Sequence, residues 1–281
     1  MDKEFKFQKI TGENASLFKD YLPERNPKRL FGDDTMGIGV LKGETPCAAI
    51  YLLKKNGCMR ILYLSVDPDY RRQGIGTRLV ESVIKSAKAG DLSEVQITYA
   101  SNIAENLEDF LEKNRFENTS EAGLIYHIPR IFLRDFLKND TDVQEMAAAW
   151  KKVSHWEEVL SFRELPSKAK DFFSFLNPDM DMSLAIREEN GNRYKAFIVV
   201  SMFAGEYFIS DMWFKKGCEE EASGLMYACF GNLYMTLTDS ESFSIVVKRE
   251  VGKRIMAYIF DPLILFGVYR ETLHTASIKI K

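Results

Sequence analysis

The run from Leu62 to Leu79 constrains this chain more than any other part of it. It reads LYLSVDPDYRRQGIGTRL: an apolar segment, a short polar loop with two glycines, and then residues at helical spacing. Glycines let successive backbone N–H groups turn toward one point, and the N-terminus of the following helix adds positive potential there. Arg71, Arg72, Arg78 and the Thr77 hydroxyl add further donors. The run predicts a strand, an anion-binding loop and a helix, with a ligand that carries several phosphates.

Two common phosphate-binding patterns do not fit this loop. A Walker A motif requires Gly-Lys-Ser/Thr, which is absent, and a dinucleotide fingerprint requires a third glycine where Leu79 stands. An ordinary tight turn with a solvated helix face is the plain alternative.

The segments around this loop predict a mixed-sheet α/β domain. Before it, we expect a first strand at 5–10 and a short helix at 14–22. Three β-compatible segments follow at 36–41, 46–53 and 59–66, and hairpin connections join them. After it, we expect a helix that ends at Gly90, then a strand, a helix and a strand: 95–100, 102–114 and 123–128.

In this context the residues Arg71-Arg72-Gln73-Gly74-Ile75-Gly76, preceded by Val-Asp-Pro, resemble the R/Q-x-x-G-x-G/A motif of the GNAT N-acetyltransferases. The resemblance covers about residues 5–128. It implies acetyl-CoA as cosubstrate and assigns the loop to the coenzyme's pyrophosphate, with Arg71 orienting the loop and the following residues binding: Arg72, Gln73, Gly74, Ile75, Gly76 and Thr77.

The same resemblance implies that the fourth and fifth strands splay apart. Leu64, Ser65 and Val66 would then pair through their main chain with the pantetheine arm, as another strand would. Asn102 is similar to the asparagine with which the family contacts the coenzyme.

The family's proton-donating tyrosine has no counterpart here, because its position falls on Asp109 or Leu111. The expected fifth strand also lacks a carboxylate that could serve as a general base. The catalytic residues therefore stay unassigned, although several polar groups lie near the expected cleft in sequence: Tyr63, Ser65, Asn102, Tyr126 and His127. Two hypotheses follow, which are catalysis without that tyrosine, or a non-catalytic acyl-CoA sensor or interaction module.

The second half repeats the order of elements of the first at an offset of roughly 147 residues. After a connecting stretch with a helix at 143–153, we expect strands at 182–188, 194–203 and 207–214. A helix at 220–237, a strand at 243–248, a helix at 251–260 and a strand at 263–269 should follow. This predicts an acetyl-CoA-binding GNAT-like domain at 1–130 and a degenerate GNAT-like domain at 131–281 that shapes the acceptor site or an interface.

The loop of the second half differs in charge from that of the first. Glu219, Glu220 and Glu221 stand where the arginines and glycines would be, and they would repel a pyrophosphate. We expect no second coenzyme site. The apolar, periodic context of several aromatic residues predicts core positions: Trp213, Tyr227, Phe230, Tyr234 and Phe243.

Composition bounds the remaining possibilities. A formal charge of −3 gives no general attraction to nucleic acid or to anionic membranes, and no apolar run is long enough to span a bilayer. The four cysteines have no CxxC spacing and the histidines lie far from them, so we expect reduced thiols and no metal. We expect a cytoplasmic monomer or homodimer that acetylates a small-molecule or peptide amine, or a protein held by the second half.

Overall fold

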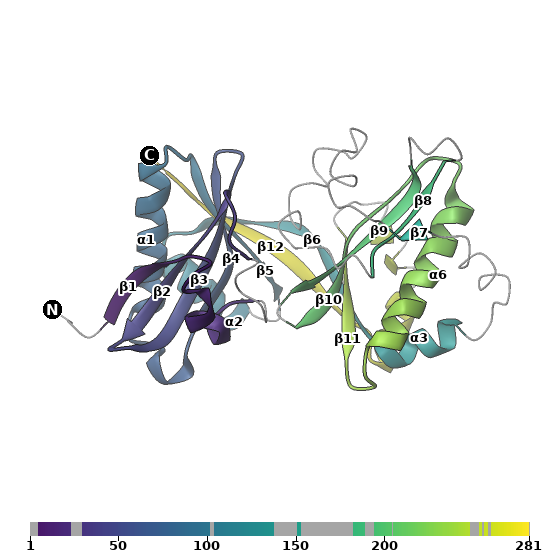
Figure 1. Ribbon diagram of the computed structural model, residues 1–281, viewed down its shortest axis with the longest axis horizontal. Helices are drawn as coiled ribbons and strands as arrows, with labels where there is room; N and C mark the ends of the chain where they lie inside the picture. The colour runs from purple at the N-terminus through teal and green to yellow at the C-terminus, as the bar shows by residue number, and fades with distance from the viewer. Residues whose placement is uncertain are drawn as a thin grey trace. The chain divides into compact units, whose positions relative to one another are not determined.

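The computed structural model describes residues 5–23, 30–101, 104–137, 151–152, 182–188, 194–203, 205–247, 253–254, 256–257 and 260–280. The chain divides into two compact units. The first comprises Met1–Gly123 and Glu271–Lys281, and the second comprises Leu124–Arg270. Each unit has helices packed against a mixed β-sheet, as the α/β pattern of the sequence predicts (Figure 1).

The sheet of the first unit has the strand order β1-β2-β3-β4-β5-β12. The strands are β1 (Phe5–Ile10), β2 (Thr35–Lys42), β3 (Thr45–Lys55), β4 (Cys58–Val66), β5 (Glu94–Ala100) and β12 (Tyr269–Lys279). Neighbours run antiparallel except β4 and β5, which run parallel. Asn56 and Gly57 both adopt positive φ in the β3–β4 turn, which is the conformation a tight hairpin needs. The predicted meander is therefore confirmed.

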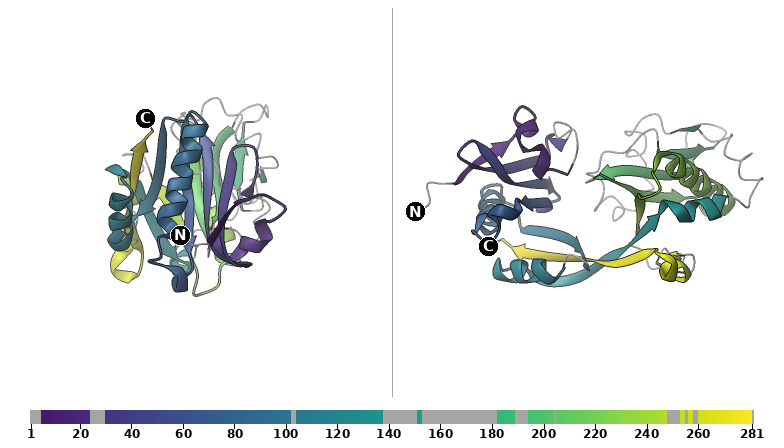
Figure 2. Two further views of the ribbon diagram at one scale, coloured as in Figure 1. Left: turned by 90° about the vertical axis from the view of Figure 1, so that its left-hand side faces the viewer. Right: turned by 90° about the horizontal axis from the view of Figure 1, so that it is seen from below.

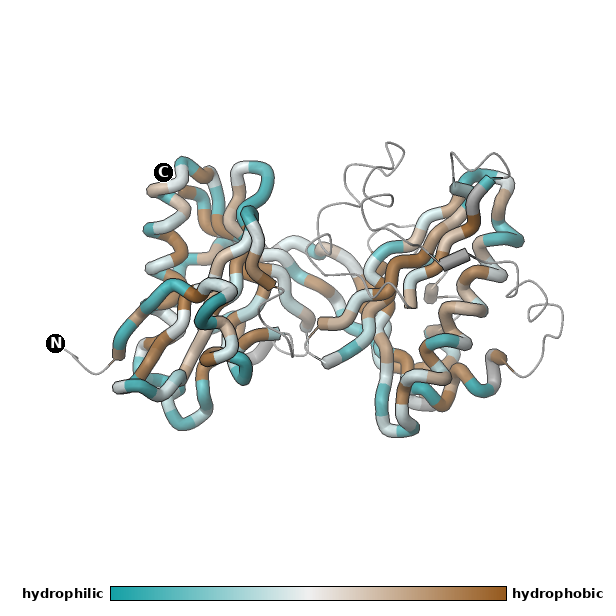
Figure 3. Tube along the Cα trace, in the orientation of Figure 1, coloured by the Kyte–Doolittle hydropathy of each residue, from teal (hydrophilic) through white to brown (hydrophobic). Residues whose placement is uncertain are grey.

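Helices cover both faces of this sheet. On one face α1 (Ile75–Ala89) buries the apolar side of its periodic pattern, and α2 (Ala104–Lys113) follows β5. The tube of α1 accordingly alternates between hydrophobic and hydrophilic colours in Figure 3, and α1 runs along the strands in Figure 2. On the other face the 3-10 helix η1 (Ala15–Tyr21) packs Phe18 against Ala49 and Tyr51 of β3, in a second hydrophobic cluster.

The sheet of the second unit has the strand order β6-β11-β10-β9-β8-β7. The strands are β6 (Glu117–Pro129), β11 (Ser242–Val247), β10 (Glu206–Phe214), β9 (Tyr194–Phe203), β8 (Leu184–Arg187) and β7 (Lys151–Lys152). Only β10 and β11 are parallel. The part of β6 from Leu124 onward pairs with β11, so this strand runs from the first unit into the second.

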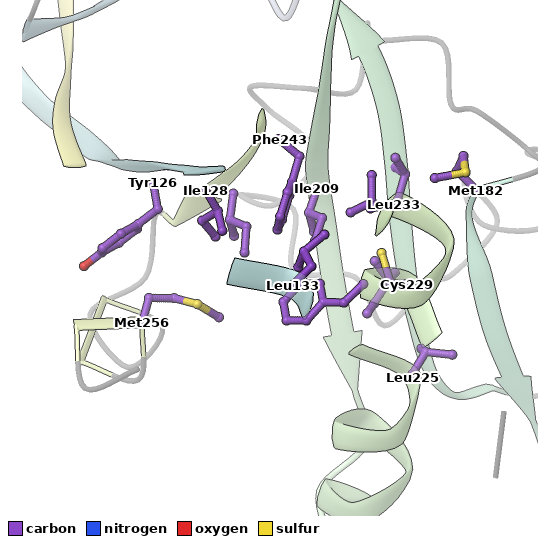
Figure 4. Close-up of a cluster of buried hydrophobic side chains, with 14 of the residues drawn as sticks. Tyr126, Ile128, Leu133, Met182, Ile209, Leu225, Cys229, Leu233, Phe243 and Met256 are labelled. Carbon is purple, nitrogen blue, oxygen red and sulfur yellow. The ribbon is translucent and has the colours of Figure 1, made fainter. Parts of the chain in front are cut away.

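The core of the second unit lies between its sheet and two helices, α3 (Arg130–Leu137) and α6 (Glu219–Thr236). Leu225, Cys229 and Leu233 of α6 belong to one buried hydrophobic cluster with Ile209 and Phe243 of the sheet (Figure 4). Phe230 and Phe243 are buried, which confirms their predicted place in the core. Tyr234 is half-buried against the same cluster.

The end of the chain corrects the sequence-based interpretation. The strand expected at 263–269 is instead a 3-10 helix, η5 (Asp261–Phe266), which Gly267 terminates with φ of 112°. β12 follows, and its residues Leu273–Lys279 pair antiparallel with β5 (Figure 2). The first unit therefore takes its sixth strand from the C-terminus, which differs from the expected boundaries 1–130 and 131–281.

Some expected elements lie wholly or partly outside the described residues. These are most of the helix at 143–153, where only β7 is described, and half of the helix at 251–260. Asn102 also lies outside them. Among the helices of the described ranges, none is both long and apolar enough to cross a bilayer.

Candidate functional site

The parallel strands β4 and β5 separate halfway along their length. β4 pairs with β3 as far as Val66, whereas its ladder with β5 ends at Ile61 and Ile97. A β-bulge at Leu62 shifts the register of the β3–β4 ladder at the same point. Backbone groups of Leu62–Val66 that face away from β3 are thus left outside both ladders, as the predicted splay requires.

Asp67 begins the loop that joins β4 to α1. Its backbone N–H donates to the carbonyl of Cys47 on β3 over 2.9 Å, which continues the sheet by one residue. Its Oδ1 atom caps the short 3-10 helix η3 (Pro68–Tyr70) by accepting from the N–H of Asp69 at 2.9 Å. Its Oδ2 atom accepts from the hydroxyl of Tyr21 at 2.8 Å.

The arginine-rich part of the loop is exposed but anchored to its surroundings. The Nε atom of Arg71 donates to the carbonyl of Val66 over 3.0 Å, which ties this side chain to the end of β4. Arg72 adopts a left-handed conformation with φ of 64°. Nε2 of Gln73 donates to the carbonyl of Asp69 over 3.2 Å. The loop is folded back on itself before it reaches the helix.

The helix α1 begins with its backbone donors unused. Gly74 precedes it with φ of 78°, a conformation that favours glycine, and a Cβ added there would meet no atom within 4 Å. The first N–H bonded in the helical pattern is that of Arg78, to the carbonyl of Gly74 at 3.0 Å. Among the described residues, no acceptor bonds the amides of Ile75, Gly76 or Thr77. Unpaired amides and a helix dipole at one place suit an anion.

Of the three arginines expected around this site, Arg78 has another contact. Its guanidinium lies 4.5 Å from the ring centroid of Phe7 on β1, which is a cation–π geometry. Arg71 and Arg72 are exposed at the loop itself. Arg78 keeps its charge near the helix start, but its guanidinium lies against the ring of Phe7.

The structure separates the other polar candidates. Tyr63 and Ser65 are half-buried on β4, beside the strand gap. Tyr126 and His127 belong to the second unit. Tyr126 is buried there with its hydroxyl 3.1 Å from Oδ1 of Asp261, and Nδ1 of His127 lies 2.8 Å from Oγ of Ser244.

The two positions that could hold the missing tyrosine lie on α2. Asp109 is exposed, and Leu111 is buried in the core of the first unit. The sequence does not single out Tyr21. Its partner Asp67, however, directly precedes Pro68, a position where an aspartate commonly caps a helical turn. Within the described ranges no three His, Cys, Asp or Glu residues are grouped as metal ligands would be.

The second unit repeats the strand gap of the first. The β10–β11 ladder ends at Ile209 and Ile245, and a bulge follows in β10 at Ser210. Ile209 lies 148 residues after Ile61, and Ile245 lies 148 residues after Ile97, so the geometry recurs at one constant spacing. Lys215 N donates to the carbonyl of Lys195 over 2.8 Å, as Asp67 does to Cys47 at the same spacing.

The loop after this second gap is shorter and acidic. Only Lys215–Cys218 separate β10 from α6, and the first turn of α6 carries Glu219, Glu220 and Glu221. The carboxylate of Glu219 accepts from the N–H of Gly217 at 3.1 Å, and that of Glu221 pairs with Lys195 at 3.1 Å. The chain's own carboxylates therefore occupy the end of this helix.

Comparisons with known proteins agree with this geometry. Residues 6–113 match the model of the acetyltransferase (GNAT) family. None of the curated proteins searched matches the chain. A solved tandem GNAT protein from the clavulanic acid biosynthesis pathway aligns over 98% of this chain and 98% of its own, with 15% identity and a TM-score of 0.65.

Two further solved structures align with part of the chain. The ribosomal-protein-S18-alanine N-acetyltransferase from Escherichia coli covers 43% of this chain and 80% of its own, at 14% identity and a TM-score of 0.36. The PaiA N-acetyltransferase from Thermoplasma acidophilum, in complex with coenzyme A, covers 42% and 91%, at 16% identity and a TM-score of 0.36. Because both scores are low, the fold of the whole chain rests on the tandem protein. Residues 6–113 thus match the GNAT acetyltransferase family, and the chain as a whole has the fold of a tandem GNAT protein.

Proposed function

We propose that the chain is an acetyl-CoA-dependent N-acyltransferase that transfers an acetyl group to a primary amine of a small molecule or peptide. The observation that carries the proposal is the alignment of two features in the first unit. The gap between β4 and β5 opens directly into a loop whose arginines and helix-terminal amides suit a pyrophosphate. A ligand with an amide-bearing arm and a diphosphate suits both features at once.

In this proposal the coenzyme contacts two segments of the first unit. The main chain of Leu64, Ser65 and Val66 pairs with the pantetheine arm along the strand gap. Donors of the loop bind the phosphates: Arg72, Gln73, Gly74, Ile75, Gly76 and Thr77, with Arg71 holding the loop to β4. Asn102 remains a proposed coenzyme contact on the strength of its sequence position alone.

The reaction needs little from the protein beyond position and polarisation. The neutral amine attacks the thioester carbonyl, whose oxygen is stabilised by backbone N–H groups at the end of β4. The carbon–sulfur bond then breaks as the amide forms, and the proton lost by the nitrogen is balanced by protonation of the thiolate. Water can carry that proton, since neither Asp109 nor Leu111 supplies a phenol.

The experiment has two stages on the full chain. Calorimetry first measures the binding of acetyl-CoA, and a free-thiol assay then measures release of coenzyme A with a panel of primary amines. Amine-dependent thiol release above the rate of hydrolysis supports the transferase. Binding of acetyl-CoA without amine-dependent release favours the second candidate, a non-catalytic acyl-CoA sensor, which the missing tyrosine supports. Absence of binding by the folded protein would refute both.

A further inference from the structure

Tyr21 lies far from the glycine-rich motif in sequence, yet it reaches the residue that begins the loop. It is the last residue of η1, and its hydroxyl donates to Oδ2 of Asp67 over 2.8 Å. Burial, followed by the bonded Asp67 carboxylate, raises the pKa of Tyr21, so the hydroxyl keeps its proton and stays the donor. The hydrogen bond is charge-assisted, because Asp67 is ionised.

Asp67 links three parts of the first unit through its own atoms. Besides Tyr21 of η1, it contacts Cys47 of β3 through its amide and Asp69 of the η3 turn through Oδ1, each over 2.9 Å. The hydrogen bond from Tyr21, then that from Asp69, lowers the pKa of Asp67. The carboxylate thus fixes the direction in which the chain leaves β4.

The next hydrogen bonds carry this order into the loop. The carbonyl of Asp69 accepts from Nε2 of Gln73 over 3.2 Å, and Gln73 directly precedes the left-handed Gly74. Hydrogen bonds therefore connect Tyr21 through Asp67 and Asp69 to Gln73. This series of hydrogen bonds ends beside the start of α1, where the unbonded amides lie.

The second unit offers a natural comparison within the same chain. The position equivalent to Asp67 is Lys215, which makes the same main-chain bond to its neighbouring strand. Its Nζ atom, however, pairs with Glu188 at 2.6 Å. The first unit has the carboxylate of Asp67 before its arginine-glycine loop. The second unit has Lys215 at that position, before a loop with glutamates.

We propose that Tyr21 is a positioning residue, which through Asp67 holds the loop Arg71–Thr77 in the geometry that binds the coenzyme's phosphates. This inference rests on the proposed function. The inference gives Tyr21 no role at the acetyl group. A substitution at Tyr21 should therefore weaken only the binding of ligands that carry the diphosphate.

The test compares Tyr21→Phe with Tyr51→Phe. Tyr51 is a matched control because it is buried in the same cluster and its hydroxyl donates to the carbonyl of Leu30 over 2.6 Å, away from the loop. Calorimetry should show coenzyme A binding weakened roughly three- to tenfold in Tyr21→Phe, and changed less than about twofold in Tyr51→Phe, whatever the melting temperatures. With acetyl-CoA, KM should rise while kcat is retained.

Two further measurements separate positioning from general destabilisation. With S-acetylpantetheine, which lacks the phosphates, kcat/KM should be the same for both variants. In Asp67→Asn, which removes the charged acceptor, adding Tyr21→Phe should cost less than about twofold further. An equal loss in Tyr51→Phe, or an equal loss with S-acetylpantetheine, would overturn the inference and leave the proposed function intact. A wild type that does not bind coenzyme A would overturn both.

Discussion

The two units share one strand geometry and differ in the loop that follows it. In the first unit, residues 67–74 lie between β4 and α1, whereas in the second only Lys215–Cys218 lie between β10 and α6. At the constant spacing of 148 residues, Arg71-Arg72-Gln73-Gly74 corresponds to Glu219-Glu220-Glu221-Ala222. The four loop residues of the first unit have become an extra helical turn in the second. A strand gap therefore recurs in both units, but only one loop offers free donors to an anion.

Exchanging the loops should have the largest effect. A first-unit variant with Arg71→Glu, Arg72→Glu, Gln73→Glu and Gly74→Ala should lose coenzyme affinity by at least about 100-fold, since two charge-assisted contacts are replaced by repulsion. Calorimetry with coenzyme A measures the loss. The reciprocal variant in the second unit, with Arg at 219 and 220, Gln at 221 and Gly at 222, should gain no binding site. Binding of coenzyme A at the second loop would show that the charge of the loop alone decides whether it binds.

Removing the left-handed glycine should have the next largest effect. Gly74→Ala places a Cβ at φ of 78°, which strains the backbone by about 1–2 kcal/mol and disturbs the start of α1. We expect coenzyme binding to weaken by roughly tenfold, through the displaced amides. Gly43→Ala is the matched control, because Gly43 also has positive φ and open space but lies in the β2–β3 turn. If the two variants lose similar melting temperature but only Gly74→Ala loses coenzyme affinity, the account is supported. Equal losses of coenzyme affinity in both variants would contradict it.

The acidic turn of the second unit should matter to stability and not to the coenzyme. The hydrogen bond from Lys195 lowers the folded-state pKa of Glu221. The ionised carboxylate therefore contributes to the stability of the fold above the unfolded pKa of about 4.3, and this contribution is lost as the pH falls through the folded pKa. Glu221→Gln should cost a few tenths to about 1 kcal/mol at pH 7, and nothing well below pH 4. Urea unfolding at both pH values measures this. A loss that persists at low pH would point to packing instead.

Modification of the second loop should leave coenzyme binding unchanged. Cys218 is half-buried at the start of α6, whereas Cys47, Cys58 and Cys229 are buried. Burial is the main cause that raises the pKa of Cys58 to about 11, and it also raises that of Cys229. Iodoacetamide should therefore label Cys218 first in the native protein. Labelled protein that has lost coenzyme affinity would contradict the separation between the two loops.

The sequence predicts the strands and the turn from β4 into α1 well because their signals are local. Hairpin turns such as Asn56-Gly57 and the change of period after Val66 each reflect backbone preferences of a few residues. The acidic loop was also visible in the charges of Glu219–Glu221. None of these features depends on distant parts of the chain.

The origin of β12 could not be predicted in the same way. Burial alternates at its start as in a strand, with Glu271 and Leu273 buried and Thr272 and His274 less so. Nothing local, however, indicates that Leu273 pairs with Ala100 in the other half of the sequence. Such pairing is decided by tertiary packing. The hydrogen bond between Tyr21 and Asp67, 46 residues apart, escaped prediction for the same reason.

The most direct test of the account is the stoichiometry of coenzyme A binding to the full chain, measured by calorimetry on the wild type and on Arg72→Glu with Gly74→Trp. The account predicts one molecule bound per chain in the wild type and none in the variant. Of the two equivalent loops that the structure describes, the loop of the first unit carries the arginines and the unbonded amides at the start of its helix. Two molecules per chain, or one that remains bound to the variant, would contradict it and place a coenzyme site elsewhere.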